Sequence, residues 1–262
     1  MTNEQKAYEF WEILKTCAIK KTDITYTELG KPINVYKRNL GGSLHLIQNY
    51  CLENELPPLS ILVVEKLTGL PGNGFMAFDI KNLEEGFNKV CNFNWLDVQN
   101  PFFYAKDGVT QTQLIDDIIR FPEKSAEVFA KIKVRGVSQQ IFRQALLKVY
   151  NCSCALCGFS YEEALEASHI ISYSQANSEQ RLDVRNGLLL CSTHHKLFDS
   201  GFITINQDYL IEWSLVNKKL KRQGNYDSLM TTDLHGKLLK LPLDEKHLPN
   251  KEYLQKHQNS FK

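Results

Sequence analysis

Two short pairs of metal-binding residue types stand out in the second half of the chain. Cys154-Ala-Leu-Cys157 has two residues between its thiols, and Cys191-Ser-Thr-His194 has the same spacing between a thiol and an imidazole. A two-residue spacing lets one tight turn point both donors at a single ion, and two such turns complete a tetrahedral zinc site. The pairs therefore predict a structural Zn2+ held by Cys154, Cys157, Cys191 and His194. The alternative is that the cysteines pack as small hydrophobic residues, and Cys152 is near enough to replace one ligand, so its role stays open.

A second set of residues lies between these pairs and directly after them. The chain reads Glu166-Ala-Ser-His-Ile170, then Arg185-Asn-Gly-Leu-Leu-Leu190, then His195-Lys-Leu-Phe-Asp-Ser-Gly201. Together with Cys154-Ala-Leu-Cys-Gly158, these segments resemble the HNH endonuclease family, in particular its branch associated with bacterial restriction and defence. The resemblance covers about residues 135–262.

The resemblance implies a ββα-metal finger that hydrolyses phosphodiester bonds with a divalent cation, Mg2+ or Mn2+. It makes His169 the general base, since an imidazole titrates near neutral pH and can accept a proton from water. By the same analogy Asn186 braces the loop that orients the base, and His195 binds the catalytic cation. Asp199 lies one helical turn after His195 on the same face, so it is expected to bind the cation or to hold His195.

One position departs from the family pattern. Many HNH enzymes have an aspartate directly before the base histidine and use it on the metal, whereas this chain has Ser168. Retention of His169, Asn186 and His195 favours an active DNA endonuclease in restriction or phage defence. Two alternatives stay open: a non-catalytic, zinc-dependent DNA-binding or regulatory module, and a nuclease effector gated by an N-terminal sensor of a small molecule or protein.

The charge distribution adds a candidate surface for DNA. The chain has 31 basic and 30 acidic residues, but residues 1–110 hold 11 and 13 of them while the rest holds 20 and 17. No acidic residue lies between Glu127 and Glu162. Lysine and arginine supply the phosphate contacts that give most sequence-independent affinity for DNA. The contacts to double-stranded DNA are therefore predicted at Lys131, Lys133, Arg135, Arg143 and Lys148, with a second basic run at residues 218–222.

The elements that must position these residues can be predicted in outline. A helix over residues 140–150 leads into the first cysteine pair, a strand ends at His169, and a helix carries His195. Residues 111–134 are predicted to be a connector with a helix. Further upstream we expect a helix around residues 8–17, a short helix capped by Thr25 with Glu28 in capping-box spacing, a helix over 43–52, a strand at 61–64 and a glycine-rich loop at 69–74.

These elements give an α+β fold with two domains. Residues 1–110 are expected to be a recognition or regulatory domain, residues 111–134 a connector, and residues 135–262 the HNH nuclease domain with a C-terminal extension. The first domain is a small α/β domain or, as a second reading supported by the basic pair Lys37-Arg38, a winged helix that binds DNA.

Composition excludes several other classes of protein. No apolar run approaches the ~18–20 residues of a membrane-spanning helix, and the N-terminus lacks the basic and apolar regions of a signal peptide. We therefore expect a cytoplasmic protein whose thiols are reduced, with Cys17, Cys51 and Cys91 as small buried hydrophobic residues. DNA is the expected partner, without a membrane, and double-strand cleavage by one site per chain favours a homodimer.

Overall fold

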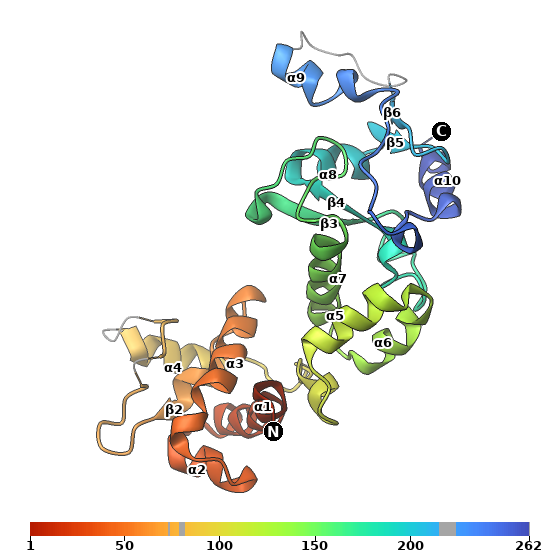
Figure 1. Cartoon of the computed structure of the whole chain (residues 1–262). Coiled ribbons are helices and arrows are strands. Elements are labelled where there is room, and N and C mark those ends of the chain that lie inside the picture. Colours follow the sequence, from red (N-terminus) through yellow and green to blue (C-terminus); the bar gives the residue numbers. More distant parts are fainter. Residues whose placement is uncertain (73, 79–81, 215–223, 262) are drawn as a thin grey trace. The chain divides into compact units, whose positions relative to one another are not determined.

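The computed structural model describes residues 1–72, 74–78, 82–214 and 224–261 (Figure 1). The chain forms two compact units: Met1–Gln111 with Lys131–Val137, and Thr112–Ala130 with Ser138–Lys262. The first boundary lies beside the expected end of the N-terminal domain, and the expected connector 111–134 is divided between the two units. None of the described helices is both long and apolar enough to cross a membrane.

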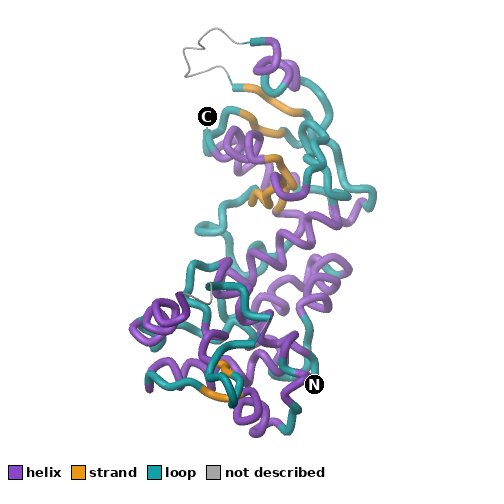
Figure 2. Tube along the Cα trace, turned by 90° about the vertical axis from the view of Figure 1, so that its left-hand side faces the viewer, coloured by secondary structure: helices purple, strands orange, loops and turns teal. Residues whose placement is uncertain are grey.

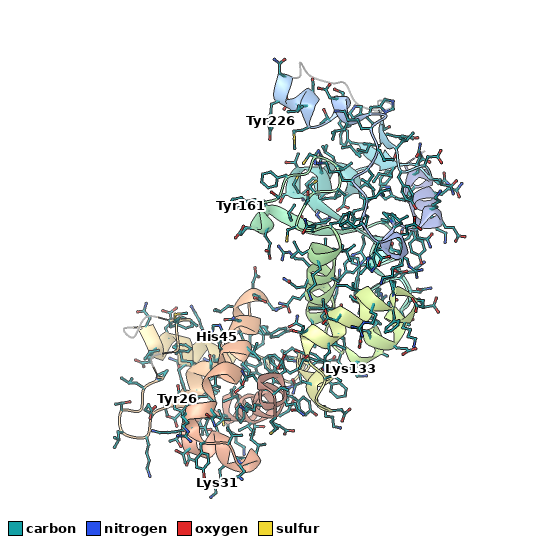
Figure 3. All side chains as sticks on the ribbon, viewed as in Figure 1. Tyr26, Lys31, His45, Lys133, Tyr161 and Tyr226 are labelled. Atoms are coloured by element: carbon teal, nitrogen blue, oxygen red, sulfur yellow. The ribbon has the colours of Figure 1, made fainter. Side chains whose placement is uncertain are left out.

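The first unit is mainly helical. Its elements are α1 (Asn3–Lys20), β1 (Ile24–Thr25), α2 (Tyr26–Gly30), α3 (Gly41–Glu53), β2 (Val63–Val64) and α4 (Leu83–Asn92). The predicted capping box is confirmed at the start of α2, whose first residue is labelled in Figure 3. The Thr25 hydroxyl accepts a hydrogen bond from the Glu28 amide at 3.3 Å, and the Glu28 carboxylate accepts one from the Thr25 amide at 3.0 Å.

Aromatic packing around α1 forms the core of this unit. The side chain of Trp11 is fully buried and meets Tyr50, Trp95 and Phe102 edge-on, with ring centroids 5.6–6.1 Å apart. Edge-to-face contacts of this kind add to the free energy gained by burying the rings. The core therefore joins α1 to α3 and to the segment after α4.

The strand predicted at residues 61–64 is largely wrong. Leu59–Leu62 form a 3-10 turn, and the strand consists of Val63–Val64 alone, paired in parallel with Ile24–Thr25. Every residue from 59 to 64 is buried, and a short buried apolar run has no period by which strand and helical turn can be told apart. Among the described residues of this unit the strands form this parallel pair without an antiparallel hairpin, so the wing of a winged helix is not seen.

The second unit surrounds a ββα element. Short strands alternate with helices and long loops (Figure 2). The elements, from the residues at the unit boundary onward, are α5 (Gln111–Arg120), α6 (Ser125–Lys131), α7 (Arg135–Val149), β3 (Leu165–His169), β4 (Gly187–Cys191), α8 (Ser192–Asp199), β5 (Ile203–Ile205), β6 (Ile211–Trp213), α9 (Asn225–Leu229) and α10 (Lys251–Asn259).

The strands β3 and β4 pair antiparallel, and α8 follows β4 without a loop. Leu165 lies opposite Cys191 and His169 opposite Gly187. All five residues of β4 are buried. A Cβ atom at Gly187 would lie 2.6 Å from both Phe142 Cζ and Leu146 Cδ1 of α7, so the glycine lets α7 pack directly against the strand. The structure thus has the expected ββα order in the C-terminal half.

Candidate active site and metal centre

The loop after α7 brings two cysteines to one point. Cys154 and Cys157 lie in a tight turn in which the Cys154 amide donates to the Phe159 carbonyl and the Gly158 amide to the Cys154 carbonyl, both at 2.8 Å. Gly158 has φ +79°, a conformation that glycine adopts without the steric cost of a Cβ atom. The backbone therefore folds back within five residues and turns both thiols to the same side.

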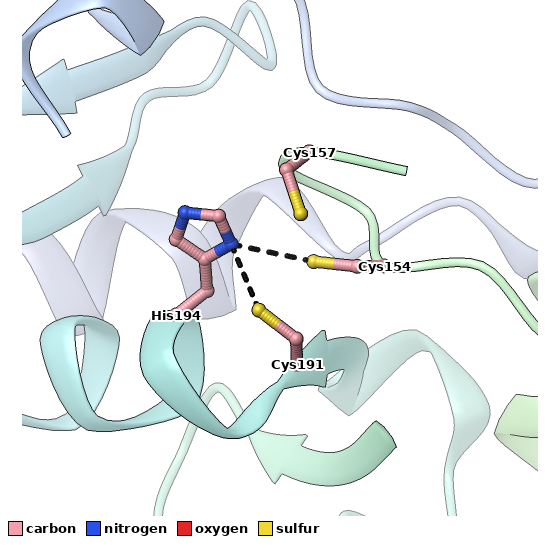
Figure 4. Close-up of side chains that lie close together, drawn as sticks. All are labelled: Cys154, Cys157, Cys191 and His194. Carbon is pink, nitrogen blue, oxygen red and sulfur yellow. Dashed lines mark hydrogen bonds between the residues drawn. The ribbon is translucent and has the colours of Figure 1, made fainter. Parts of the chain in front are cut away.

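The other two residues come from the junction of β4 and α8. Cys191 ends the strand, and His194 lies in the first turn of the helix. The Nδ1 atom of His194 is 3.3 Å from Cys191 Sγ and 3.5 Å from Cys154 Sγ, and one ligand atom from each of the four residues lies within 4.8 Å of the others (Figure 4). The structure thus brings together all four residues of the two pairs. Cys152 is not part of this cluster among the described residues.

The surroundings of the cluster fit a zinc ion. His194 Nε2 donates to the Met230 carbonyl at 2.9 Å, which leaves Nδ1, the atom facing the sulfurs, as the nitrogen with the lone pair. Hydrogen bonds from Cys157 and Cys191 hold the pKa of the Cys154 thiol well below its usual range. A buried thiolate with two further thiols and an imidazole nitrogen is the donor set of a structural zinc site.

The two sides of β3 carry two different sets of polar residues. Side chains alternate along a strand, so Glu166 and Ser168 share one face while His169 is on the other. Glu166 and Ser168 contact α8, whereas the His169 ring stacks on Phe142 of α7 with a centroid distance of 4.1 Å. His169 is the last residue of β3, so its imidazole lies at the end of the strand.

A carbonyl group selects the tautomer of His169. The ring nitrogen Nε2 lies 3.1 Å from the Arg181 carbonyl oxygen, which can only accept, so Nε2 carries the proton. In a neutral ring Nδ1 is then the basic nitrogen. Tyr173 meets the ring edge-on at 5.7 Å, and with Phe142 it fixes the orientation of the imidazole. This arrangement suits a group that removes a proton from water.

Asn186 ties together the loop that supplies this carbonyl. Its side chain is fully buried, and its Oδ1 atom accepts from the Ile171 amide at 2.8 Å. Its Nδ2 atom donates to the carbonyls of Gln180 at 3.0 Å and Ile171 at 3.2 Å. The two ends of the loop between β3 and the turn before β4 are therefore held by one side chain, next to the Arg181 carbonyl that orients His169.

His195 lies between two carboxylates. Its Nδ1 atom is hydrogen-bonded to Glu166, and its Nε2 atom is 3.3 Å from Asp199 Oδ2. The Ser168 hydroxyl is 3.5 Å from the other oxygen of Asp199. An imidazole nitrogen and a carboxylate oxygen that face each other are suitable ligands for a divalent cation. Ser168 thus contributes a hydrogen bond to the Asp199 carboxylate.

Glu166 is a residue that the sequence interpretation missed. Burial alone would raise its pKa, but hydrogen bonds with Ser192 and His195 outweigh burial, and the pKa of Glu166 lies below its usual range. Glu166 is therefore a carboxylate that orients the imidazole of His195. The sequence did contain a signal for this role. Glu166 lies two residues before Ser168, so both side chains are on the same face of the strand, the face that contacts α8.

One cavity of this unit is lined by three of the candidate catalytic and cation-binding residues. It has a volume of about 740 Å3, and His169, His195 and Asp199 all line it. Two residues of α10, Lys256 and His257, line it as well, and the sequence interpretation singled out neither. The His257 ring is buried and stacked on Phe198 with a centroid distance of 3.8 Å, and burial lowers the pKa of His257 to about 4.

The residues predicted to contact DNA are divided between the two units. Lys131, Lys133 and Arg135 are exposed in the first unit, where Lys133 lies 5.3 Å from the centre of the Phe103 ring. In the second unit Arg143 donates to the carbonyls of Glu162 and Leu165, at 2.8 and 3.2 Å. Lys148 pairs with Asp116 at 3.0 Å. The structure thus gives Arg143 and Lys148 partners within their own unit, and the DNA contacts of all five residues stay a prediction. The run 218–222 lies outside the described residues.

Comparisons with known proteins found matches to the C-terminal part of the chain and to one solved structure. Residues 154–206 match the family model described as HNH endonuclease, a range that includes the cysteine–histidine cluster, His169, Asn186, His195 and Asp199. No curated protein matches the chain. One solved structure that it matches is described as a modification dependent TagI restriction endonuclease, with 18% identity over 44% of this chain, 35% of that chain and a TM-score of 0.29. The chain thus spans about a third of the length of that protein. The C-terminal unit of the present chain thus contains an HNH domain, at residues 154–206.

Proposed function

We propose that the chain is a DNA endonuclease that hydrolyses phosphodiester bonds with a divalent cation and acts in restriction or phage defence. The observation that carries this proposal is the single cavity lined by His169, His195 and Asp199. A base for water and two cation ligands are the groups that phosphodiester hydrolysis requires. The match to the HNH endonuclease family over residues 154–206 supports the same reaction class.

The roles follow from the contacts of each residue. His169 accepts the proton of the attacking water at Nδ1, because the Arg181 carbonyl holds the proton at Nε2. Asn186 keeps the loop around this carbonyl in place. His195 Nε2 and Asp199 would hold Mg2+ or Mn2+, with Glu166 behind His195. When bound, the cation would offset the negative charge that develops on the scissile phosphate.

The cysteine–histidine cluster has a structural role in this proposal. Cys154, Cys157, Cys191 and His194 would hold Zn2+, and the first turn of α8 carries His194 next to His195. The bound ion would fix the first turn of α8. His195, the residue after His194, would then be held in position to bind the catalytic cation. Double-strand cleavage with one such cavity per chain is expected to need two copies of the protein.

A metal-dependent nicking assay tests the proposal. Supercoiled plasmid, unmodified or carrying modified bases, is incubated with the full chain in Mg2+ or Mn2+. Wild-type protein should nick the plasmid, and His169→Ala should lower the rate by about 10^2–10^4-fold, the usual contribution of a general base. His235→Ala is the matched control, because His235 is exposed and does not line the cavity. Wild-type protein that binds zinc but leaves every plasmid intact would refute the proposal.

A further inference from the structure

The first unit has a pocket of its own. Its volume is about 290 Å3, at the small end of the range for ligand pockets. The lining residues come from α2, from the turn at Lys37–Asn39, from α3 and from the segments that contain Ser60, Glu65, Gly72, Gly74 and Phe75. The pocket lies among residues of the first unit alone, and no role assigned above uses it. The lining residues that matter most for its chemistry are Tyr26, Lys37, Arg38, Gly41, His45 and Gln48.

A buried amide provides a hydrogen-bond donor in this pocket. Gln48 is 3% exposed, and its Oε1 atom accepts from the Met76 amide at 3.4 Å and faces the Ser60 hydroxyl at 3.5 Å. The Met76 N–H can only donate, so the amide is oriented with Oε1 toward it and Nε2 away from it. No described residue accepts a hydrogen bond from Nε2. The Nε2 group can therefore donate to a carbonyl oxygen or a ring nitrogen of a ligand in the pocket.

The entrance of the pocket is cationic. Lys37 and Arg38 precede α3, and His45 lies on its second turn. The helix begins at Gly41, which lines the pocket, with no side-chain cap and no acidic residue in its first turn. Uncapped amides at a helix N-terminus together with basic side chains favour an anion such as phosphate. Among the described lining residues Glu65 is the acidic one, and it lies 3.8 Å from Lys37.

An aromatic ring forms part of the wall. The Tyr26 hydroxyl accepts a hydrogen bond from the Gly72 amide at 3.0 Å, and this contact holds the ring in place. Both Tyr26 and His45 are labelled in Figure 3 on the first unit. Aromatic side chains are the usual stacking surface for a nucleic-acid base, because every base has a π-face.

We propose that this pocket binds one nucleotide. Its phosphate lies at Lys37, Arg38 and the start of α3, and its base lies against Tyr26, with a carbonyl or ring nitrogen accepting from Gln48 Nε2. A free mononucleotide and a nucleotide turned out of a DNA strand present the same groups. The heat of binding detects a free mononucleotide, and the fluorescence of a labelled duplex detects a nucleotide turned out of DNA.

Equilibrium binding to the full chain tests the proposal without any use of cleavage. One arm titrates the common mononucleotides, with inorganic phosphate alone as reference, and follows the heat of binding. The other arm uses a DNA duplex with 2-aminopurine opposite a mismatch, whose fluorescence reports unstacking of the base. The variants are Gln48→Leu and the exposed pair Lys37→Ala/Arg38→Ala. Lys31→Ala removes an exposed cation of the same unit that does not line the pocket.

We expect saturable binding in one arm. Gln48→Leu should weaken it by roughly 5- to 10-fold, the usual effect of one lost hydrogen bond, and the Lys37/Arg38 variant should weaken it further, while Lys31→Ala binds as wild type does. Binding in the mononucleotide arm identifies a free effector, and a signal in the duplex arm alone identifies a nucleotide of DNA. Affinity for inorganic phosphate equal to that for nucleotides, absence of binding in both arms, or binding that neither set of pocket variants weakens would overturn the proposal.

Discussion

Replacing Glu166 with glutamine changes one contact behind the proposed cation ligand His195. Glutamine keeps the size of the side chain and removes its charge, so His195 Nδ1 loses a carboxylate partner while Asp199 stays 3.3 Å from Nε2. A hydrogen bond to a charged acceptor contributes ~1.5–3 kcal/mol. Glu166 is 42% exposed in its side chain, so solvent reduces this value toward its lower end. At ~1.4 kcal/mol per tenfold change, the affinity for the catalytic cation should fall by roughly 10-fold, within the ~10- to 100-fold range typical of such partners.

The assay for Glu166→Gln is the rate of plasmid nicking as a function of Mg2+ concentration. The half-saturating concentration should rise by roughly 10-fold, with a smaller change in the rate at saturation, since His169 is unaltered. Glu163→Gln is the matched control, because Glu163 is exposed in the turn before β3 and does not contact His195. If Glu166→Gln and wild type need the same Mg2+ concentration, Glu166 does not position His195 and the assigned ligand geometry is incorrect.

Three further predictions concern stability and metal content. Cys154→Ser should lose bound zinc and several kcal/mol of stability, whereas Cys152→Ser keeps both; equal zinc content by elemental analysis in the two variants would contradict the cluster. Gly187→Ala should lower the free energy of unfolding by ~1–3 kcal/mol through overpacking against α7, and Gly224→Ala, where the nearest atom to the new Cβ is 3.8 Å away, should change it little in urea titrations. His257 has a folded-state pKa of about 4 against an ordinary 6.5, so the stability from keeping it neutral is complete above pH 6.5 and is lost as the pH falls through 4. Wild type should therefore lose roughly 3 kcal/mol more than His257→Phe between pH 7 and pH 4; equal losses would show that His257 is not the responsible group.

The parts of the fold that depend on residues close together in the sequence were predicted correctly. The Thr25–Glu28 capping box needs two side chains three residues apart, and it forms as predicted. The two cysteine pairs specify their own turns, and Cys154, Cys157, Cys191 and His194 come together as expected. In contrast, the buried run at 59–64 has no alternation of apolar and polar residues that would indicate a strand or a helix. Its conformation depends on packing against α1 and α3, and the sequence of the run alone does not specify this packing.

The parts of the site that were missed depend on contacts between distant segments. Glu166 becomes recognisable as a partner of His195 once α8 is packed on the face of β3 that carries it. His257 enters the cavity from a tail helix whose sequence shows amphipathic character and little else, and it does so because its ring stacks on Phe198. Similarly, Arg143 is one of several basic residues in a stretch without acidic residues. It donates hydrogen bonds to the carbonyls of Glu162 and Leu165, which lie 19 and 22 residues further along the chain.

The adjacency of His194 and His195 has a practical consequence for inhibition. One peptide bond separates a donor of the buried cysteine–histidine cluster from the proposed donor to the catalytic cation. A chelator would therefore act twice on the same helix. If the proposed metal sites are correct, it would first remove the exchangeable cation in a reversible step and later extract the zinc ion, and loss of the zinc ion would release the first turn of α8. Restoring Mg2+ should then rescue the proposed nicking activity after brief exposure, whereas recovery after prolonged exposure should also require zinc and refolding. The proposed nuclease would in that case depend on the zinc supply of its surroundings.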